Sequence, residues 1–177
     1  MNVVLEVAGL NIGFRQDGRE ISAVRGVSFT VGKGETVALV GESGSGKSVT
    51  ALSTVGLLPD SARVTGSVRY LGQEMVGASQ AQLRRVRGND ISFIFQEPMT
   101  SLNPVHTIER QLAESLSLHQ GLSGAAARAR SVELLDKVGI RDAESRLSAY
   151  PHQLSGGQRQ RVMIAMALAN GPELLVA

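Results

Sequence analysis

The chain has 177 residues, of which 42% are hydrophobic, and this length suits a single domain with a sizeable core. Its formal net charge is only +2, and no basic run interleaved with aromatic residues is present, so composition argues against a nucleic-acid-binding protein. The absence of cysteine excludes disulfides and thiolate metal sites, and the longest apolar run, residues 162–169, is far too short to span a bilayer.

Apolar alternation and turn residues predict an α/β core in the first half of the chain. A turn is expected at residues 15–20, and a glycine- and serine-rich loop at 41–46. The predicted elements are, in chain order, strands at 3–8, 26–31 and 35–40, a helix from 47 to about 58, a strand at 66–72, a helix near 79–87 and a strand at 90–96.

After residue 96 the pattern changes to helical period alone. Helices are predicted at 107–120, at 123–139 with Ser123 as its N-cap and Gly139 at its C-terminal end, and at 155–170. The apolar run "PELLVA" at 172–177 then predicts a buried parallel strand. The layout is an α/β core, a helical insertion at about 97–155, and a return to the core.

The segment "GESGSGKS", residues 41–48, predicts a phosphate-binding loop because it fits G-x-x-x-x-G-K-[ST] between a predicted strand and a predicted helix. Its glycines allow backbone N–H groups to converge on phosphate oxygens. Lys47 is then expected to reach the β- and γ-phosphates, and Ser48 Oγ to bind Mg²⁺. The alternative is an ordinary glycine-rich turn. A GTPase would also need a guanine-reading NKxD stretch, which this sequence lacks.

A second anion site is predicted at "LSGGQRQR", residues 154–161. Ser155 and Gln158 have the spacing of a capping box at a helix N-terminus. Gly156 and Gly157 leave the first N–H groups of that helix unshielded for an anion. One nucleotide does not readily fill two such sites in one small domain, so the pattern favours a dimer in which each second site faces the partner's phosphate loop.

These motifs resemble the ATP-binding domains of ABC transporters over the whole chain. "LSGGQ" matches the family's signature motif, "GESGSGKS" its Walker A loop, and "FIFQEPMTSLNP" its Q-loop. The resemblance implies an α/β P-loop NTPase of the ABC type with N-terminal antiparallel strands. It divides the chain into a RecA-like core, residues 1–96 and 156–177, and a helical subdomain, residues 97–155.

The resemblance also implies ligands and their residues. Catalysis would rest on Lys47 and Gln96, with Gln96 at the γ-phosphate, and Mg²⁺ would be bound by Ser48 and Gln96. Phe14 falls where the family stacks the adenine, although it can equally be core at a strand end; Gln96 can likewise be a polar strand terminus. The residues implied in ATP binding are Phe14, Gly41, Glu42, Ser43, Gly44, Ser45, Gly46, Lys47, Ser48, Val49, Ser155, Gly156, Gly157 and Gln158.

Three further features are interpreted as structural. His152 is expected in a surface loop, the stripe Val162, Met166 and Ala169 in the core, and the "RQR" at 159–161 on a solvated helix face with a partner contact.

Within the family, "FQEPMTSLNP" and "YPHQLSGGQRQRVMIAMAL" are most similar to ATPase subunits of peptide and nickel importers. The sequence of residues 86–121 is similar to that of a fused subunit with two ATP-binding domains, which serves a peptide and microcin C importer. The resemblance implies a transport-coupled ATPase at the cytoplasmic face of the inner membrane. Its partners would be a second ATP-binding domain, arranged head to tail, and membrane permease subunits.

In this family the strand corresponding to "PELLVA" is Walker B, which is followed by the acidic residues that hold Mg²⁺ and align water. No residue follows Ala177, so the 177-residue chain is expected to be truncated and hydrolytically inactive by itself. Two other readings stay open: a soluble ABC ATPase of repair or translation, disfavoured by the short insertion, and a non-hydrolysing nucleotide-binding module.

Overall fold

The computed structural model describes residues 2–16, 18–95 and 101–177. These residues form two compact units, Met1–Val86 and Arg87–Ala177. Each unit is described by itself below. The subdomain boundaries at 97 and 155 are finer than this division and stay a prediction.

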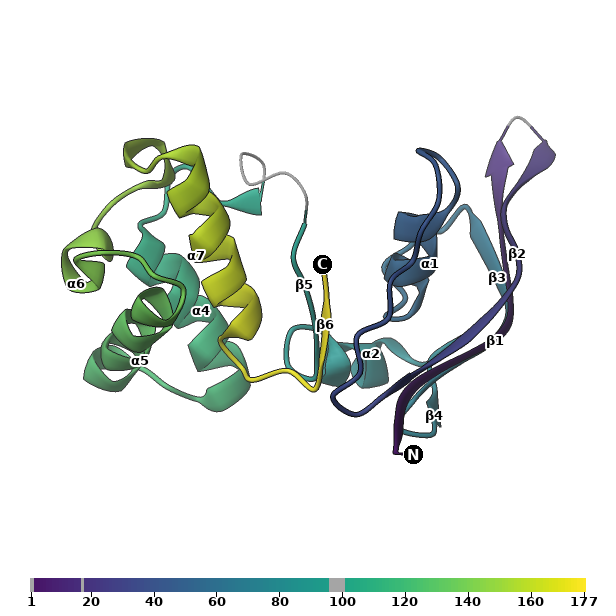
Figure 1. Cartoon of the computed structure of the whole chain (residues 1–177), viewed down its shortest axis with the longest axis horizontal. Helices are drawn as coiled ribbons and strands as arrows, with labels where there is room; N and C mark the ends of the chain where they lie inside the picture. The colour runs from purple at the N-terminus through teal and green to yellow at the C-terminus, as the bar shows by residue number, and fades with distance from the viewer. Residues whose placement is uncertain (1, 17, 96–100) are drawn as a thin grey trace. The chain divides into compact units, whose positions relative to one another are not determined.

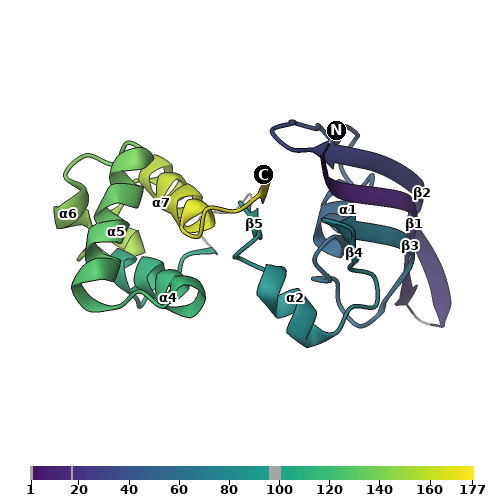
Figure 2. The same cartoon turned by 90° about the horizontal axis from the view of Figure 1, so that it is seen from below.

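The first unit is a four-stranded antiparallel sheet with two short helices (Figure 1). The strand order is β2-β1-β3-β4, and α1 lies on one face of the sheet in both views (Figure 2). Its elements are β1 (Val3–Gln16), β2 (Arg19–Gly32), α1 (Lys47–Ser53), β3 (Ala62–Tyr70), β4 (Gln73–Glu74) and α2 (Gln80–Val86).

Strands β1 and β2 form one long hairpin, and its inward side chains build the first core. Val7, Leu10 and Ile12 of β1 are almost fully buried, as is Val68 of β3 opposite Val7. The register shifts between Val7 and Leu10, which marks a bulge. The bulge keeps its polar groups paired, since Asn11 Oδ1 accepts a hydrogen bond from Gly26 N at 2.8 Å.

Four sequence predictions in this unit need correction. The strand predicted at 66–72 runs from Ala62 to Tyr70, and residues 71–72 form a turn. The hairpin strands reach far beyond the predicted 3–8 and 26–31, because the polar residues at their ends pair across the turn although they lack an apolar pattern. The helix predicted to residue 58 ends at Ser53. The predicted strand at 35–40 has no regular structure, and Val40 is 91% exposed. The β-branched residues of the segment 35–40 favour a strand, but a strand also requires a hydrogen-bonded neighbouring strand.

Glu74 fixes the turn between β3 and β4. Its Oε1 accepts hydrogen bonds from the N–H groups of Val68, Met75 and Val76, at 2.9, 3.2 and 3.1 Å, and Ser67 Oγ donates to Oε2. Burial raises the pKa of Glu74, but these hydrogen bonds outweigh it and hold the pKa below its ordinary value of 4.5. The carboxylate therefore stabilises the turn in its charged form.

Replacing Glu74 by glutamine is expected to loosen this turn in a pH-dependent way. A depressed folded-state pKa contributes stability that is present above the unfolded-state value and lost as the pH falls through the folded value. At pH 7 the amides of Val68, Met75 and Val76 should exchange about two- to fivefold faster in Glu74→Gln, as for an exposed charged contact. The difference in exchange rate between Glu74→Gln and the wild type should disappear below pH 4. Glu6→Gln is the matched control, because the Glu6 carboxylate forms an ion pair with Arg69 at 3.9 Å on the neighbouring strand and takes no part in the hydrogen bonds of this turn. An equal difference in exchange rate at pH 7 and pH 3 would contradict a stabilising role for the charged Glu74 carboxylate.

The second unit contains four α-helices and a pair of short strands among its described residues (Figure 1). Helices α4, α5 and α7 pack on one another (Figure 2). The elements are β5 (Ile91–Phe93), α4 (Ile108–Gln120), α5 (Gly124–Lys137), α6 (Ala143–Arg146), the 3₁₀ helix η1 (Pro151–Gln153), α7 (Gly156–Leu168) and β6 (Leu174–Val176).

An aliphatic core joins these helices, as the lack of tryptophan requires. Ile108, Leu112 and Leu116 form the buried stripe of α4 at helical spacing, and Leu134 and Leu135 of α5 are equally buried. The three predicted long helices are confirmed to within two residues at each end. Strands β5 and β6 pair in parallel, as predicted. The prediction that the last strand is buried is wrong, because Leu174 and Val176 are half-buried and Leu175 is 41% exposed.

The predicted core stripe on α7 is confirmed. Val162 and Ala169 are buried, and Met166 packs against the same core. Among the described residues, no helix combines the length and the apolar character needed to cross a bilayer.

Candidate functional site

The phosphate loop runs from residue 41 to 46 and leads directly into α1. Gly44 and Gly46 have φ of +82° and +90°, a left-handed conformation that favours glycine. At Gly46 a side chain is also blocked sterically, because its Cβ would lie 2.6 Å from the carbonyl oxygen of Ala23 on β2. The second glycine of the motif therefore lets the loop lie against the sheet at the start of α1.

Lys47 turns its side chain back into this loop. Its Nζ donates hydrogen bonds to the carbonyl oxygens of Gly41 and Glu42 at 2.8 and 2.7 Å, and to Ser45 Oγ at 3.3 Å. All three acceptors are neutral, so none of these contacts cancels the ammonium charge. The loop thus curls around the Lys47 ammonium.

The other loop residues leave room for a ligand. Residues 41–45 and Ser48 are exposed, and Val49 is half-buried. At Gly41 an added Cβ would meet Ser45 Oγ at 2.5 Å, so a side chain there would force Ser45 to shift. The predicted loop residues therefore lie together in one open, glycine-lined turn.

The signature motif begins α7 with the capping box predicted from its sequence. Ser155 Oγ accepts a hydrogen bond from Gln158 N at 3.3 Å, and Gln158 Oε1 accepts one from Ser155 N at 2.9 Å. Gly156 and Gly157 are exposed, and a Cβ on either would meet no atom within 4 Å. The first turn of α7 is therefore rigidly capped and open to an incoming group.

Two arginines after the motif anchor it, a role the sequence reasoning missed. Arg159 Nε donates to the carbonyl oxygens of Pro151 and Leu154 at 2.7 and 3.0 Å. Arg161 donates to those of Val138 and Gly139, at 2.9 and 3.1 Å, at the C-terminal end of α5. The prediction of a solvated face at 159–161 is therefore confirmed for Gln160 and Arg161, which are exposed, and wrong for Arg159, which is half-buried. The carbonyl partners of Arg161 lie 23 and 22 residues before it, so no local pattern could have revealed them.

The remaining predicted residues are less informative. Phe14 lies half-buried on β1 opposite Ile21 and Ala62, which leaves both of its interpretations open. Gln96 lies outside the described residues. His152 is exposed in η1, where its ring stacks on Tyr150 with centroids 5.7 Å apart, in agreement with a surface position.

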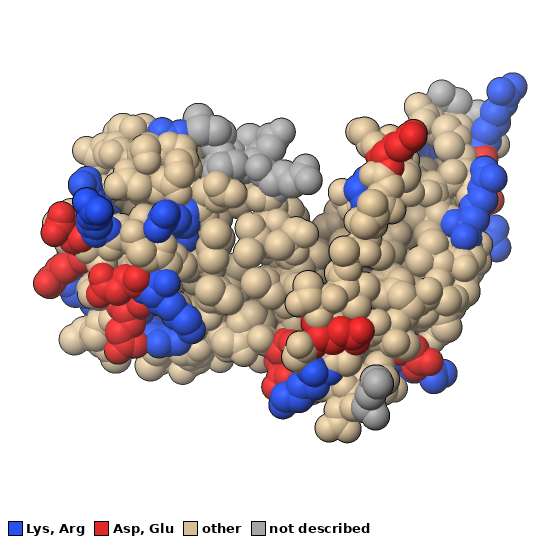
Figure 3. Space-filling view, viewed as in Figure 1, with Lys and Arg blue, Asp and Glu red and all other residues tan. Residues whose placement is uncertain are grey.

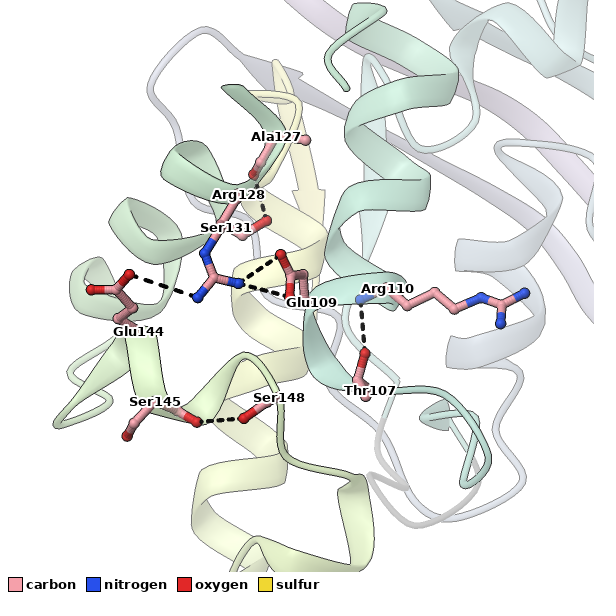
Figure 4. A network of polar contacts seen from close by, with 9 residues as sticks. All are labelled: Thr107, Glu109, Arg110, Ala127, Arg128, Ser131, Glu144, Ser145 and Ser148. Atoms are coloured by element: carbon pink, nitrogen blue, oxygen red, sulfur yellow. Dashed lines mark hydrogen bonds and ion pairs between the residues drawn. The ribbon is translucent and has the colours of Figure 1, made fainter. Parts of the chain in front are cut away.

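Ion pairs between charged side chains outside the motifs connect three of the helices. Arg128 of α5 donates to both carboxylate oxygens of Glu109 on α4 at 2.9 Å, and approaches Glu144 of α6 at 3.6 Å (Figure 4). The hydrogen bonds that Arg128 donates to the Glu109 carboxylate raise the pKa of Arg128 above its ordinary value. Basic and acidic side chains are interspersed on the helical unit in Figure 3 rather than gathered by sign.

Two hollows, of about 520 and 660 Å³, flank this ion-pair network on the helical unit. Neither is lined by a residue of the phosphate loop or of the signature motif. Among the described residues, no group of three or more His, Asp or Glu side chains is placed to hold a metal ion.

A glycine-lined phosphate loop and a capped LSGGQ helix, in an α/β chain with an antiparallel sheet, define an ATP-binding cassette of the P-loop class. Residues 24–177 match the model of the ABC transporter family, and the chain belongs to that family. The phosphate loop belongs to the first unit and the signature motif to the second.

Relatives and solved structures agree with this assignment. The chain is 60% identical over 176 residues to the peptidoglycan transport ATP-binding protein YejF of Agrobacterium fabrum, covering 98% of this chain and 32% of that protein. It is 53% identical over 175 residues to a putative peptide import ATP-binding protein of Brucella abortus, covering 98% and 53%. The chain thus spans about a third to a half of these relatives.

The fold matches the ATP-binding cassette MJ0796, solved as a dimer in a post-hydrolysis state bound to ADP and Pi. The TM-score is 0.84 at 28% identity, over 97% of this chain and 72% of that one.

Proposed function

We propose that this chain is the ATP-binding domain of a bacterial ABC importer that uses ATP binding and hydrolysis to drive transport, most specifically of peptides. The observation that carries the proposal is the phosphate loop curled around the Lys47 ammonium. The peptidoglycan and peptide transport names of the relatives support the substrate class.

In this proposal the loop holds the nucleotide through its backbone. The N–H groups of residues 41–49 face the phosphates, and Lys47 exchanges its carbonyl partners for β- and γ-phosphate oxygens. Ser48 Oγ and the Gln96 side chain bind Mg²⁺, which neutralises charge on the phosphates. Phe14 stacks on the adenine. The open glycine-lined loop fits such a ligand, because the group that lies inside it is the Lys47 ammonium, whose charge attracts phosphate oxygens.

The signature motif acts on the ATP of a second domain. Ser155, Gly156, Gly157 and Gln158 present a capped, unshielded helix N-terminus, which favours a phosphate group. A head-to-tail dimer brings this terminus to the partner's phosphate loop, and the dimeric state of MJ0796 supports this arrangement. The second domain can belong to the same polypeptide, since the relatives are two to three times longer.

The membrane subunits are the remaining partners, and the domain sits against them at the cytoplasmic face of the inner membrane.

The test is reconstitution of the protein encoded by the complete gene with the permeases encoded beside it. In proteoliposomes, Mg²⁺-dependent ATPase activity and ATP-dependent uptake of radiolabelled pentaalanine are expected together. ATP turnover in a soluble protein that has no permease partner would instead identify a soluble ABC ATPase. ATP binding without turnover would identify a non-hydrolysing module.

A further inference from the structure

Gln111 of α4 is a buried polar side chain that grips the turn at residues 103–106. Its Oε1 accepts a hydrogen bond from Asn103 N at 2.9 Å, and its Nε2 donates to Asn103 O at 3.1 Å and to His106 O at 3.0 Å. Gln111 is 6% exposed. Three hydrogen bonds from one buried amide fix the position of this turn on the helix.

The start of α4 is tied in turn to the segment at residues 147–149. The N–H of Ile108 donates to Ala149 O, and that of Glu109 to Leu147 O, both at 2.9 Å. Helix N-termini leave such N–H groups without intrahelical partners. Here the backbone of another segment takes them, next to the Thr107 cap visible in Figure 4.

The segment at 147–149 leads straight into the signature motif. Tyr150 N donates to Gln153 Oε1 at 2.8 Å, which closes η1. Arg159 of α7 then donates to the carbonyl oxygens of Pro151 and Leu154. A continuous set of hydrogen bonds therefore runs from the 103–106 turn, through the start of α4, to the capped end of α7.

Resting on the proposed function, we propose that Gln111 is a positioning residue that makes the 103–106 turn and the signature motif move as one body. The turn begins seven residues after Gln96, so it carries the chain from the predicted Q-loop into the helices. Any displacement of the turn is then passed to Ser155 through paired backbone groups rather than through a flexible loop.

The test is Gln111→Met in the assembled importer, because methionine keeps the unbranched shape and removes all three hydrogen bonds. ATPase kcat, normalised to moles of bound ATP so that misfolded protein is not counted, should fall at least about fivefold. The KM for ATP should stay within about twofold, as the phosphate loop is untouched. Amide exchange should become faster at 101–107 and also at 147–158, but not in α5.

The matched control is Gln120→Met on the same helix. Its Nε2 donates to Ala169 O at 3.0 Å, at the end of α4 far in sequence from the turn, so wild-type kcat is expected. Asn103→Ala, which removes only the exposed acceptor for Val105 N, should give a smaller change of the same kind if Gln111→Met fails to fold.

Three results would overturn the proposal: unchanged exchange at 147–158 in a Gln111→Met protein, faster exchange throughout the second unit, or an equal loss of kcat in Gln120→Met. A wild-type importer that neither binds nor hydrolyses ATP would instead refute the proposed function, and the exchange measurements would still decide the role of Gln111.

Discussion

Replacing Lys47 by alanine is expected to lower ATP turnover at least about 100-fold, because it removes a preorganised cationic donor from the phosphates. ATP affinity should fall about tenfold or more, as for a lost hydrogen bond to a charged group. The ammonium already lies inside the loop, 2.8 and 2.7 Å from its carbonyl oxygens. Steady-state ATPase assays and ATP titration of the complete protein measure both effects.

Lys33→Ala is the matched control for this variant. It removes the same charge from an exposed side chain, and its backbone N–H keeps its hydrogen bond to Asn2 O. It should behave as wild type. Lys47→Arg keeps the charge but changes the donor geometry, so it should restore only part of the activity. Wild-type binding and turnover in Lys47→Ala would disprove the assignment of the loop.

Replacing Gly157 by aspartate is expected to abolish ATPase activity while leaving the domain folded. A Cβ at Gly157 has open space around it, so the fold accepts the new side chain. A carboxylate in the first turn of α7 even stabilises that helix, by about 0.3–1 kcal/mol. In a closed dimer, however, it would face the γ-phosphate of the partner's ATP and repel it. Turnover should fall at least about 100-fold, with ATP affinity for the single domain unchanged.

Gln160→Asp is the control for charge alone, because Gln160 is exposed on the same helix three residues further on. Thermal unfolding should show Gly157→Asp at or slightly above the wild-type midpoint. A Gly157→Asp protein that loses ATP binding as a separate domain, yet still dimerises, would refute action across the dimer.

The features predictable from the sequence were those determined within one turn of a helix or one tight loop. The capping box of Ser155 and Gln158, the left-handed glycines and the ends of α4, α5 and α7 are set by residues a few positions apart. Such local rules apply whatever the rest of the fold does.

The features that escaped prediction depend on the path of the backbone beyond one turn of a helix. The segment at 35–40 has strand propensity, yet it has no regular structure. The sequence does not show that Arg159 and Arg161 donate hydrogen bonds to backbone carbonyl oxygens, although Arg161 is exposed as predicted. Gln111 is one polar letter in an amphipathic helix, and only the path of the 103–106 turn makes it a buried anchor.

The cap at Ser155 restricts which residues evolution can place there. Helix capping alone would accept serine, threonine, aspartate or asparagine, since each supplies an oxygen for the N–H of Gln158. Aspartate, however, carries a negative charge and no hydrogen to donate, whereas a hydroxyl still has its hydrogen after accepting the cap bond. If the cap faces a phosphate, folding permits four residues at this position, but the phosphate repels aspartate, which is one of the strongest helix caps. At residue 155, selection for stability therefore accepts aspartate, whereas selection for contact with a nucleotide favours a neutral side chain such as serine.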